Sequence, residues 1–320
     1  MRNPLRNAIH ALFHDPRHIA YALLHRMPWL IRDDAKYLSA LYQLELGVKP
    51  DLEHPKKFSE KIQWLKLHDH NPLYTTMVDK LAVKEFVSER LGKEYVIPMI
   101  AEWDSPEQIE WEKLPNQFVL KTNHDGGGRG IVTCKDKSKF SISDAFRELK
   151  ESYNKSSYSR TREWPYKNVQ RRVFAEEFVN DSNEELRDYK FFCFNGKVKC
   201  YKVDFNRQVD HRANYFDLAG HMLPYGEAMC PPDFAANIHI PENIQEMIAL
   251  AEKLAKDIPF VRIDFYNVDG KIYFGEITFY PASGMSKWVG DVDVDAVWGE
   301  QIVFPRRIIG ERTPRGGYRI

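Results

Sequence analysis

The sequence predicts a mixed fold of class α/β (α+β), in which helices and antiparallel strands form two lobes. Strand and helix periodicities alternate from about residue 95 onward. The Asn195-Gly196 pair separates two apolar runs, and this dipeptide is the strongest short-range signal of a β-hairpin. At 320 residues the chain is too long for one small core and short for three full domains. A cleft between two lobes is therefore expected.

Composition and charge exclude several classes of protein. The chain has 43% hydrophobic and 29% charged residues and no low-complexity tract, which is typical of a globular protein. Its 46 basic and 46 acidic side chains give zero formal charge, so no nucleic-acid partner is expected. The four cysteines lack the spacing of a zinc site or a disulfide framework, which favours the reducing cytoplasm.

Residues 1–72 form the first region, and apolar positions at three- and four-residue intervals predict that it is mainly helical. Its first thirty residues contain no apolar run long enough to span a bilayer. They mix leucines with arginines, a pattern that fits a weak peripheral contact with the inner face of a membrane. The arginines are Arg2, Arg6, Arg17 and Arg26. A solvated basic face on an ordinary helix is the commoner explanation of such a pattern.

Two lobes are expected to follow, divided at residue 172. The first lobe covers residues 73–172, with a helix at 74–91, strands at 96–101, 118–122 and 130–134, and a helix at 143–153. The second lobe covers residues 173–308, with strands at 173–179, 188–194, 197–204, 261–266 and 272–279 and a helix at 244–256. Residues 309–320 are expected to form a C-terminal tail.

Two carboxylates interrupt the apolar strands of the last predicted hairpin. Asp264 stands in Val-Arg-Ile-Asp-Phe-Tyr, and Glu276 stands in Phe-Gly-Glu-Ile-Thr-Phe-Tyr. Buried carboxylates are costly unless they are paired or bind a cation, and oxygen ligands suit Mg²⁺. The sequence therefore predicts a metal site here, with the solvent face of an amphipathic strand as the alternative.

The register of this hairpin decides whether the two carboxylates share a face. A four-residue turn at 267–270 would place Asp264 and Glu276 on opposite faces, because side chains alternate with a period of two. A shared metal ion therefore requires a turn with an odd number of residues, or a β-bulge that adds one residue.

A glycine-rich loop follows the predicted strand that ends at Lys121. Residues 123–130 have the sequence Asn-His-Asp-Gly-Gly-Gly-Arg-Gly and lead directly into the next strand. Glycines let backbone N–H groups approach phosphate oxygens, and a lysine on a strand adds a fixed positive charge. A plain hairpin turn is the alternative, and the loop matches neither a Walker loop nor a dinucleotide fingerprint.

A basic loop follows the predicted strand at 197–204. It contains Arg207, His211 and Arg212, and a pair of guanidinium groups suits bidentate recognition of a carboxylate or phosphate. These three residues are therefore candidates for binding an acceptor substrate. A solvated basic loop is the alternative.

Several motifs together resemble the ATP-grasp superfamily in their order and spacing. They are Val-Asp-Lys80, Phe-Val-Leu-Lys121, the loop from Gly126 to Gly130, Ala-Glu176-Glu177-Phe-Val, Val-Arg262-Ile-Asp264 and Gly-Glu276-Ile-Thr278. Three longer stretches look like its TupA-like branch, which is associated with teichuronopeptide and other surface-polysaccharide synthesis. They are Lys-Phe-Ser-Glu-Lys-Ile-Gln-Trp-Leu-Lys, Asp188-Tyr-Lys190-Phe-Phe-Cys-Phe-Asn-Gly and Tyr-Phe-Gly-Glu-Ile-Thr-Phe-Tyr-Pro-Ala-Ser-Gly.

The resemblance implies an ATP-grasp fold that binds ATP and Mg²⁺. ATP would be held by two lysines, the glycine-rich flap, a hinge that contacts the adenine edge, and the start of the next strand, where Asp188 would contact the ribose. These residues are Lys80, Lys121, Gly126, Gly127, Gly128, Arg129, Gly130, Glu176, Glu177, Phe178, Val179, Asp188 and Lys190.

The resemblance also implies the metal ligands and the catalytic residues. Asp264 and Glu276 would hold the metal ions, with Thr278 at a position where many ATP-grasp ligases have an asparagine ligand. Arg262 corresponds to the arginine that faces the developing acyl phosphate in related ligases, and Lys121 would assist it.

The activity that the resemblance implies is that of a carboxylate-amine ligase. Such an enzyme forms an acyl phosphate from a carboxylate and ATP, and an amine then displaces phosphate to give an amide. The expected partners are an amino acid and a small-molecule or glycan acceptor, joined during capsule or other surface-polysaccharide biosynthesis. The alternatives are a phosphotransferase acting on a sugar or glycan, and a glycosyltransferase-associated or regulatory nucleotide-binding protein.

Overall fold

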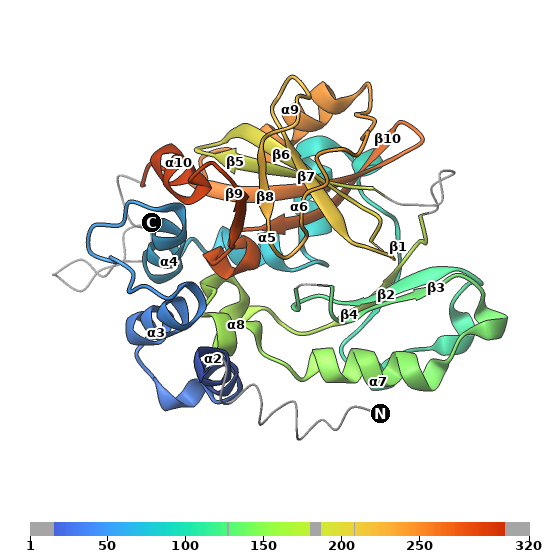
Figure 1. The fold of residues 1–320 in the computed structure, drawn as a ribbon. Coiled ribbons are helices and arrows are strands. Elements are labelled where there is room, and N and C mark those ends of the chain that lie inside the picture. Colours follow the sequence, from blue (N-terminus) through green and yellow to red (C-terminus); the bar gives the residue numbers. More distant parts are fainter. Residues whose placement is uncertain (1–15, 127, 180–186, 208, 305–320) are drawn as a thin grey trace, which may run out of the picture.

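The structure of the protein is a computed structural model that describes residues 16–126, 128–179, 187–207 and 209–304. Predictions for residues 1–15, for Gly127 and for the tail at 309–320 lie outside the described residues. Two larger antiparallel sheets, a short two-stranded ribbon and the surrounding helices make up the described chain (Figure 1). The predicted class of helices mixed with antiparallel strands is confirmed.

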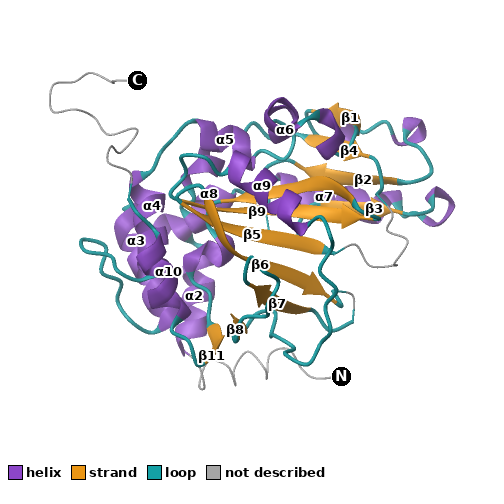
Figure 2. Ribbon diagram, turned by 90° about the horizontal axis from the view of Figure 1, so that it is seen from above, coloured by secondary structure: helices purple, strands orange, loops and turns teal. Residues whose placement is uncertain are grey.

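Six helical segments open the described chain. They are α2 (Pro16–Arg26), η1 (Pro28–Leu30), α3 (Asp34–Leu46), α4 (Phe58–His68), α5 (Leu73–Val78) and α6 (Val83–Leu91). α3 begins where the Asp33 carboxylate accepts a hydrogen bond from the Lys36 N–H at 2.8 Å, and it ends at Gly47, whose φ is 79°. Figure 2 shows α2, α3 and α4 gathered with α10 (Val294–Gln301) at one end of the sheets.

The smaller sheet has the strand order β1-β4-β2-β3. Its strands are β1 (Met99–Trp103), β2 (Phe118–Thr122), β3 (Ile131–Cys134) and β4 (Val173–Glu176). Helix α7 (Ile142–Tyr153) lies along one side of it (Figure 1), because Ala145 and Leu149 belong to the same buried cluster as Phe118 and Leu120. Short elements connect its parts: η2 (Lys93–Tyr95), η3 (Pro106–Gln108), η4 (Trp111–Lys113), η5 (Lys137–Lys139), α8 (Ser157–Thr161) and η6 (Trp164–Asn168).

The larger sheet has the strand order β10-β9-β5-β6-β7. Its strands are β5 (Asp188–Phe194), β6 (Lys197–Phe205), β7 (Arg212–Phe216), β9 (Phe260–Val268) and β10 (Lys271–Thr278). Helix α9 (Ile244–Leu254) buries Met247 and Ala251 in the core that this sheet shares. The ribbon pairs β8 (Tyr225–Glu227) with β11 (Trp288–Gly290), and η7 (Pro281–Gly284) follows β10.

Aromatic packing attaches the N-terminal helices to the larger sheet. The Phe58 ring of α4 lies 4.9 Å from the Phe260 ring of β9 and 5.2 Å from the Trp298 ring of α10, measured between ring centroids. Phe194 of β5 contacts both Phe260 and Trp298 in the same way. Edge-to-face contacts of this kind add to the stabilisation from buried area. Helix α4 is therefore part of the main core, whereas Leu24 of α2 packs with Tyr37 and Leu41 of α3 in a separate cluster.

Two tight turns shape the larger sheet. Asn195 and Gly196 have φ of 49° and 78° and join β5 to β6, which confirms the predicted hairpin. Asp269 and Gly270 have φ of 51° and 84° and form a two-residue turn between β9 and β10. The four-residue turn expected at 267–270 is therefore wrong. The strands pair up to the residues that flank Asp269-Gly270, because this dipeptide by itself supplies the turn.

The division into lobes differs from the predicted boundaries. Strand β4 pairs with β1 and β2, so the smaller sheet continues to Glu176 rather than ending at residue 172. Helices α5 and α6 contribute Met77 and Val87 to the core of the larger sheet, although they precede the smaller sheet in sequence. All four cysteines are free. No helix within the described residues is long and apolar enough to cross a bilayer.

Candidate active site in the cleft between the sheets

A β-bulge at Gly275 places Glu276 beside Asp264. Phe274 pairs with Phe265 and Glu276 pairs with Asp264, so Gly275 is an extra residue on β10. Because the turn of this hairpin has two residues, the shared face requires such a bulge, and this prediction is confirmed. A Cβ atom on Gly275 would lie 3.1 Å from the Asp264 carbonyl oxygen, so the chains approach closely at this point.

Arg262 links the two acidic residues. Its Nε donates to Asp264 Oδ1 at 2.7 Å and its Nη2 donates to Asp264 Oδ2 at 2.7 Å. The same Nη2 donates to Thr278 Oγ1 at 3.1 Å, and the Thr278 hydroxyl donates to Glu276 Oε1 at 2.7 Å. Thr278 therefore holds Glu276 and Arg262 in fixed positions relative to each other, in addition to its predicted place near the metal.

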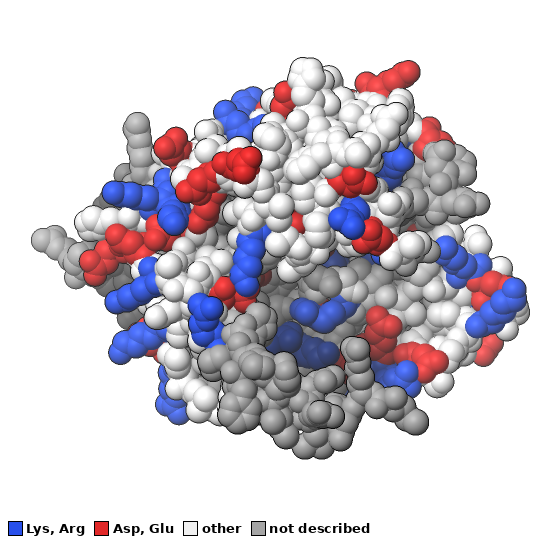
Figure 3. Space-filling view, in the orientation of Figure 1, with Lys and Arg blue, Asp and Glu red and all other residues white. Residues whose placement is uncertain are grey.

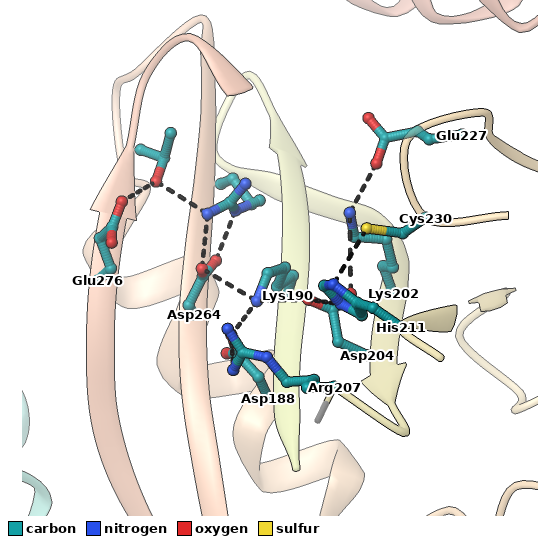
Figure 4. A network of polar contacts seen from close by, with 12 residues as sticks. Asp188, Lys190, Lys202, Asp204, Arg207, His211, Glu227, Cys230, Asp264 and Glu276 are labelled. Carbon is teal, nitrogen blue, oxygen red and sulfur yellow. Dashed lines mark hydrogen bonds and ion pairs between the residues drawn. The ribbon is translucent and has the colours of Figure 1, made fainter. Parts of the chain in front are cut away.

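Lys190 of β5 extends this network across the sheet. It is paired with Asp264 in the register, and its Nζ lies 3.7 Å from Asp264 Oδ2 and 3.1 Å from Asp204 Oδ2 (Figure 4). Nζ also forms an ion pair with Asp188. These carboxylates outweigh burial and raise the pKa of Lys190 above its ordinary value. Burial raises the pKa of Asp264 to about 6, against the lowering effect of Arg262 and Lys190.

The opposite wall of the site comes from the smaller sheet and α6. Lys121 of β2 and Lys84 of α6 both form ion pairs with Glu176 of β4, and the Lys84 Nζ lies 2.8 Å from Glu176 Oε2. Burial alone would raise the pKa of Glu176, but Lys121 and Lys84 outweigh it and lower the pKa. Lys80 donates a hydrogen bond to the carbonyl oxygen of Asp125 at the base of the flap.

These two walls enclose one cleft of about 420 Å³. Figure 3 shows the molecular surface hollowed between the upper and lower lobes, with basic side chains inside the hollow. Eleven of the predicted site residues line the cleft: Lys80, Lys121, Gly128, Glu176, Asp188, Lys190, Arg207, His211, Arg262, Asp264 and Glu276. The fold therefore brings together the phosphate, ribose, metal and acceptor candidates.

Other predicted residues are not part of the lining of the cleft. They are Gly126, Arg129, Gly130, Glu177, Phe178, Val179, Arg212 and Thr278. The Arg129 guanidinium is turned toward Asp125, with Nη2 at 3.0 Å from Oδ1. Gly130 has a φ of 64°, and a Cβ atom there would lie 2.3 Å from hydroxyl oxygens of Thr122 and Ser152. The flap is thus fixed by Asp125 and by the close approach at Gly130.

Sequence reasoning missed several residues that line the cleft. Lys84 lies on a helix that gave no functional signal, and its role comes from the ion pair with Glu176. Asp204 ends a strand that was predicted, and its acidic side chain at the end of an apolar run was an available signal. Tyr266 is two residues from Asp264 on the same strand and so shares its face, which was an available signal. Phe174 has an ordinary strand pattern, so the sequence offered no means of placing it in the cleft.

The acceptor candidates separate into two groups. Arg207 Nη1 lies 3.5 Å from Asp188 Oδ2, and His211 Nε2 lies 3.5 Å from Asp204 Oδ2, and both residues line the cleft. Arg212 instead pairs with Asp210 at 2.8 Å and does not line the cleft. Oδ1 of Asp188 and Oδ1 of Asp204 are buried without a hydrogen-bond partner among the described residues, so the cleft retains acceptor capacity.

The carboxylates fit a magnesium site that a phosphate ligand completes. Within the described residues, no group of three or more His, Cys, Asp or Glu side chains is placed to hold a metal ion by itself. Magnesium commonly binds through one or two carboxylates plus substrate phosphates, and paired Asp264 and Glu276 match that requirement. Both oxygens of Asp264 are hydrogen-bonded to Arg262, so Arg262 would have to release at least one of them to an ion.

Two antiparallel sheets that close on a cleft lined by lysines and carboxylates define a protein of the ATP-grasp class. More narrowly, this chain belongs to the family described as TupA-like ATPgrasp, whose profile matches residues 60–303. This match confirms the resemblance found in the sequence. A comparison with curated protein sequences found no similar protein.

Solved structures with some similarity to this chain are ligases and synthetases. D-alanine–D-alanine ligase from Bacillus anthracis, complexed with ATP, is 15% identical, with a TM-score of 0.37 over 64% of this chain and 54% of that chain. D-alanyl-alanine synthetase A from Vibrio cholerae is 12% identical, with a TM-score of 0.40 over 80% of this chain and 66% of that chain. N5-carboxyaminoimidazole synthetase from Staphylococcus aureus is 16% identical, with a TM-score of 0.36 over 63% of this chain and 44% of that chain. The match spans less than two thirds of each of these proteins.

Proposed function

We propose that this protein is an ATP-dependent carboxylate-amine ligase that forms an amide through an acyl phosphate. The observation that carries the proposal is the bulge at Gly275. It sets Glu276 opposite Asp264 on a sheet face that lines the same cleft as Lys80 and Lys121. Carboxylates and cations on facing walls are what a Mg-ATP complex requires.

ATP would lie between the two sheets. Lys80, Lys84 and Lys121 give one wall the positive charge that suits the phosphates, and Gly128 of the flap lies at the same cleft. The adenine edge would contact the backbone after β4. The Glu177 N–H already donates to the Pro98 carbonyl at 3.0 Å, so the backbone of the next two residues, Phe178 and Val179, would make this contact.

Asp264 and Glu276 would hold Mg²⁺ together with oxygens of the ATP phosphates. An ion held by these two residues would supply positive charge to offset the negative charge of the phosphates. Arg262 lies between the two acidic residues, where its guanidinium would stabilise the charge on the substrate carboxylate and the transferred phosphoryl group. Closure of the sheets on the cleft would exclude the water that hydrolyses an acyl phosphate.

The acceptor would occupy the end of the cleft near β6 and β7. Arg207 is the candidate for binding its carboxylate, and Arg212 provides a matched control because it carries the same charge outside the cleft. Arg207→Ala should raise the KM for the acceptor, while Arg212→Ala should leave it unchanged. Equal effects of the two substitutions on KM would exclude Arg207 from acceptor binding.

We further propose that the two substrates are an amino acid and a sugar acid of a surface polysaccharide or its precursor. The test is a screen of amino acids and uronic acids for ATP-dependent ADP release, with mass spectrometry of the product. An amide product with release of phosphate is expected. A product that gains only a phosphoryl group would identify a phosphotransferase instead, and Glu276→Gln should lower either activity by about 100-fold or more.

A further inference from the structure

A second groove lies outside the cleft between the sheets and is rich in basic side chains. It has a volume of about 670 Å³ and is formed by α2, η1 and the segment around α8. Figure 1 shows α2 and α8 near each other at the lower left of the fold, and Arg162 at the end of α8 holds η1 by donating to the Pro28 carbonyl at 3.1 Å. The lining residues are Ala22, His25, Arg26, Pro28, Trp29, Lys155, Ser156, Ser159, Arg160 and Arg162.

The groove is positively charged. The described residues that line it include three arginines, a lysine and a histidine and no acidic residue. Two of these cations form ion pairs with acidic residues that do not line the groove. Arg162 pairs with Asp34 at 2.8 Å, and Lys155 pairs with Glu151 at 3.8 Å. Among the described residues no ion pair is found for Arg26 or Arg160, so these two arginines contribute most of the positive charge of the groove.

The environment of His25 agrees with a positive groove. Burial lowers its pKa, and Arg160 is the first of the charged groups that lower it further, followed by Arg129 and Lys66. A protonated His25 is therefore disfavoured unless an anion enters the groove.

One large apolar side chain that lines this groove, Trp29, and two in the same helical segments, Leu23 and Leu30, are exposed. Trp29 is 65% exposed, Leu30 is 62% exposed and Leu23 is 48% exposed. Leu23 and Arg26 are three residues apart on α2 and so share a face of the helix. The opposite face of α2 buries Leu24 against α3, so the fold of the N-terminal helices does not use Leu23.

We propose that α2, η1 and the Arg160 segment form a docking surface for an anionic phospholipid bilayer. Cations that meet lipid phosphates, beside a tryptophan and leucines that enter the interfacial region, are the features of peripheral membrane attachment. A soluble phosphate or an anionic glycan would bind Arg26 and Arg160. Neither ligand would explain why the apolar side chains of Leu23 and Leu30 are exposed to solvent. An anionic bilayer accounts for both the basic and the apolar side chains of the surface.

This surface differs from the membrane contact expected from the sequence. That expectation placed the contact on the arginines of the first thirty residues, and Arg2 and Arg6 lie outside the described residues. The structure adds Arg160, which is more than 130 positions away in sequence, and the exposed ring of Trp29.

The test is co-sedimentation of the full chain with vesicles. Binding to vesicles of phosphatidylcholine with 30% phosphatidylglycerol is expected, and binding to pure phosphatidylcholine vesicles should be at least tenfold weaker because the charge term is lost. Arg26→Glu with Arg160→Glu should lower the affinity by more than tenfold, at about fivefold for each cation removed. Trp29→Ala with Leu30→Ser should also lower it by at least fivefold.

Matched controls keep the test specific. Lys139→Glu with Phe234→Ala changes an exposed cation and an exposed aromatic residue far from the groove and should bind as the unmodified chain does. Brominated acyl chains should quench tryptophan fluorescence in the unmodified chain, and Trp29→Phe should lose most of this quenching. Unchanged vesicle binding by both groove variants, or full displacement by millimolar inorganic phosphate without any quenching, would overturn the proposal.

Discussion

The Asp264 carboxyl is the clearest conflict between charge and burial at the scale of single residues. It is 4% exposed and hydrogen-bonded to Arg262 through both oxygens, with Lys190 on its other side. Asp188 adds a further negative charge nearby, and burial remains the larger influence. The fold therefore holds a carboxyl group that gains from a proton or from a metal ion.

The pKa of Asp264 predicts a specific pH dependence of stability. Folding raises this pKa from 3.8 to about 6, so the folded state binds the proton more tightly and the stability from this group falls as pH rises from about 4 to 6. The full change is about 3 kcal/mol. In thermal melts at pH 5, 6 and 7, the melting temperature should fall more with rising pH for the unmodified protein than for Asp264→Asn. Parallel curves for the two proteins would contradict the raised pKa.

Glu176 is a second residue whose charge matters to the fold. It is 3% exposed and lies between Lys84 and Lys121, so Glu176→Gln would leave two cations side by side without their shared carboxylate. Breaking a buried pair in this way costs about 3 kcal/mol, which urea unfolding would measure. The exposed pair of Glu110 and Lys113 gives the control, since Glu110→Gln should unfold as the unmodified chain does. The interpretation fails if both variants unfold at the same urea concentration.

At the scale of elements, the hairpin of β9 and β10 is the part that organises the site. Its two-residue turn fixes the pairing of the first four positions, and the bulge then shifts β10 by one residue. Glycine suits the bulge because any side chain at position 275 would approach the Asp264 carbonyl oxygen and the ring of Tyr266. The geometry of the carboxylates is therefore a property of the whole hairpin.

Two glycines of this hairpin should respond differently to alanine. Gly275→Ala places its Cβ 3.1 Å from the Asp264 carbonyl oxygen and should weaken Mg-ATP binding by at least fivefold, because Glu276 shifts relative to Asp264. Gly270→Ala has open space but a φ of 84°, so it should lose about 1 kcal/mol of stability with unchanged Mg-ATP affinity. Calorimetric titration and urea unfolding separate the two effects. Equal Mg-ATP affinity in both variants would show that the bulge does not control the site.

At the scale of the whole molecule, the cleft depends on two sheets that are built from separate cores. The smaller sheet and α7 share one buried cluster, while the larger sheet shares another with α5, α6 and the aromatic contacts of α4. Lys121 comes from the first unit, and Asp264 comes from the second. A ligand that contacts both units should therefore stabilise their arrangement.

Mg-ATP should raise the melting temperature of the intact protein. At a concentration 100-fold above Kd the stabilisation is about 2.7 kcal/mol, which corresponds to a shift of several degrees. Arg212→Ala should retain this shift, because Arg212 does not line the cleft. Glu276→Gln should lose most of it. An equal shift in Glu276→Gln, or the same shift with ATP in the absence of Mg²⁺, would remove Glu276 from the metal site.

Much of the fold and part of the site follow from local signals in the sequence. The dipeptide Asn195-Gly196 fixes a turn because both residues tolerate positive φ, and the alternation of apolar residues marks β5, β9 and β10. Asp264 and Glu276 stand out because carboxylates are rare within apolar strands. Such features depend on neighbouring residues along the chain, so the sequence alone determines them.

The tertiary structure decided the features that depend on long-range packing. The bulge at Gly275 depends on how β10 pairs with β9. The sequence left open whether the hairpin has a turn with an odd number of residues or a β-bulge. Lys84 became a cleft residue through Glu176, and Arg207 and Arg212 were separated although they are five residues apart. The basic groove joins α2 to Arg160 in the same way. Register, burial and charge pairing between distant segments depend on how whole elements pack, and no local pattern encodes that packing.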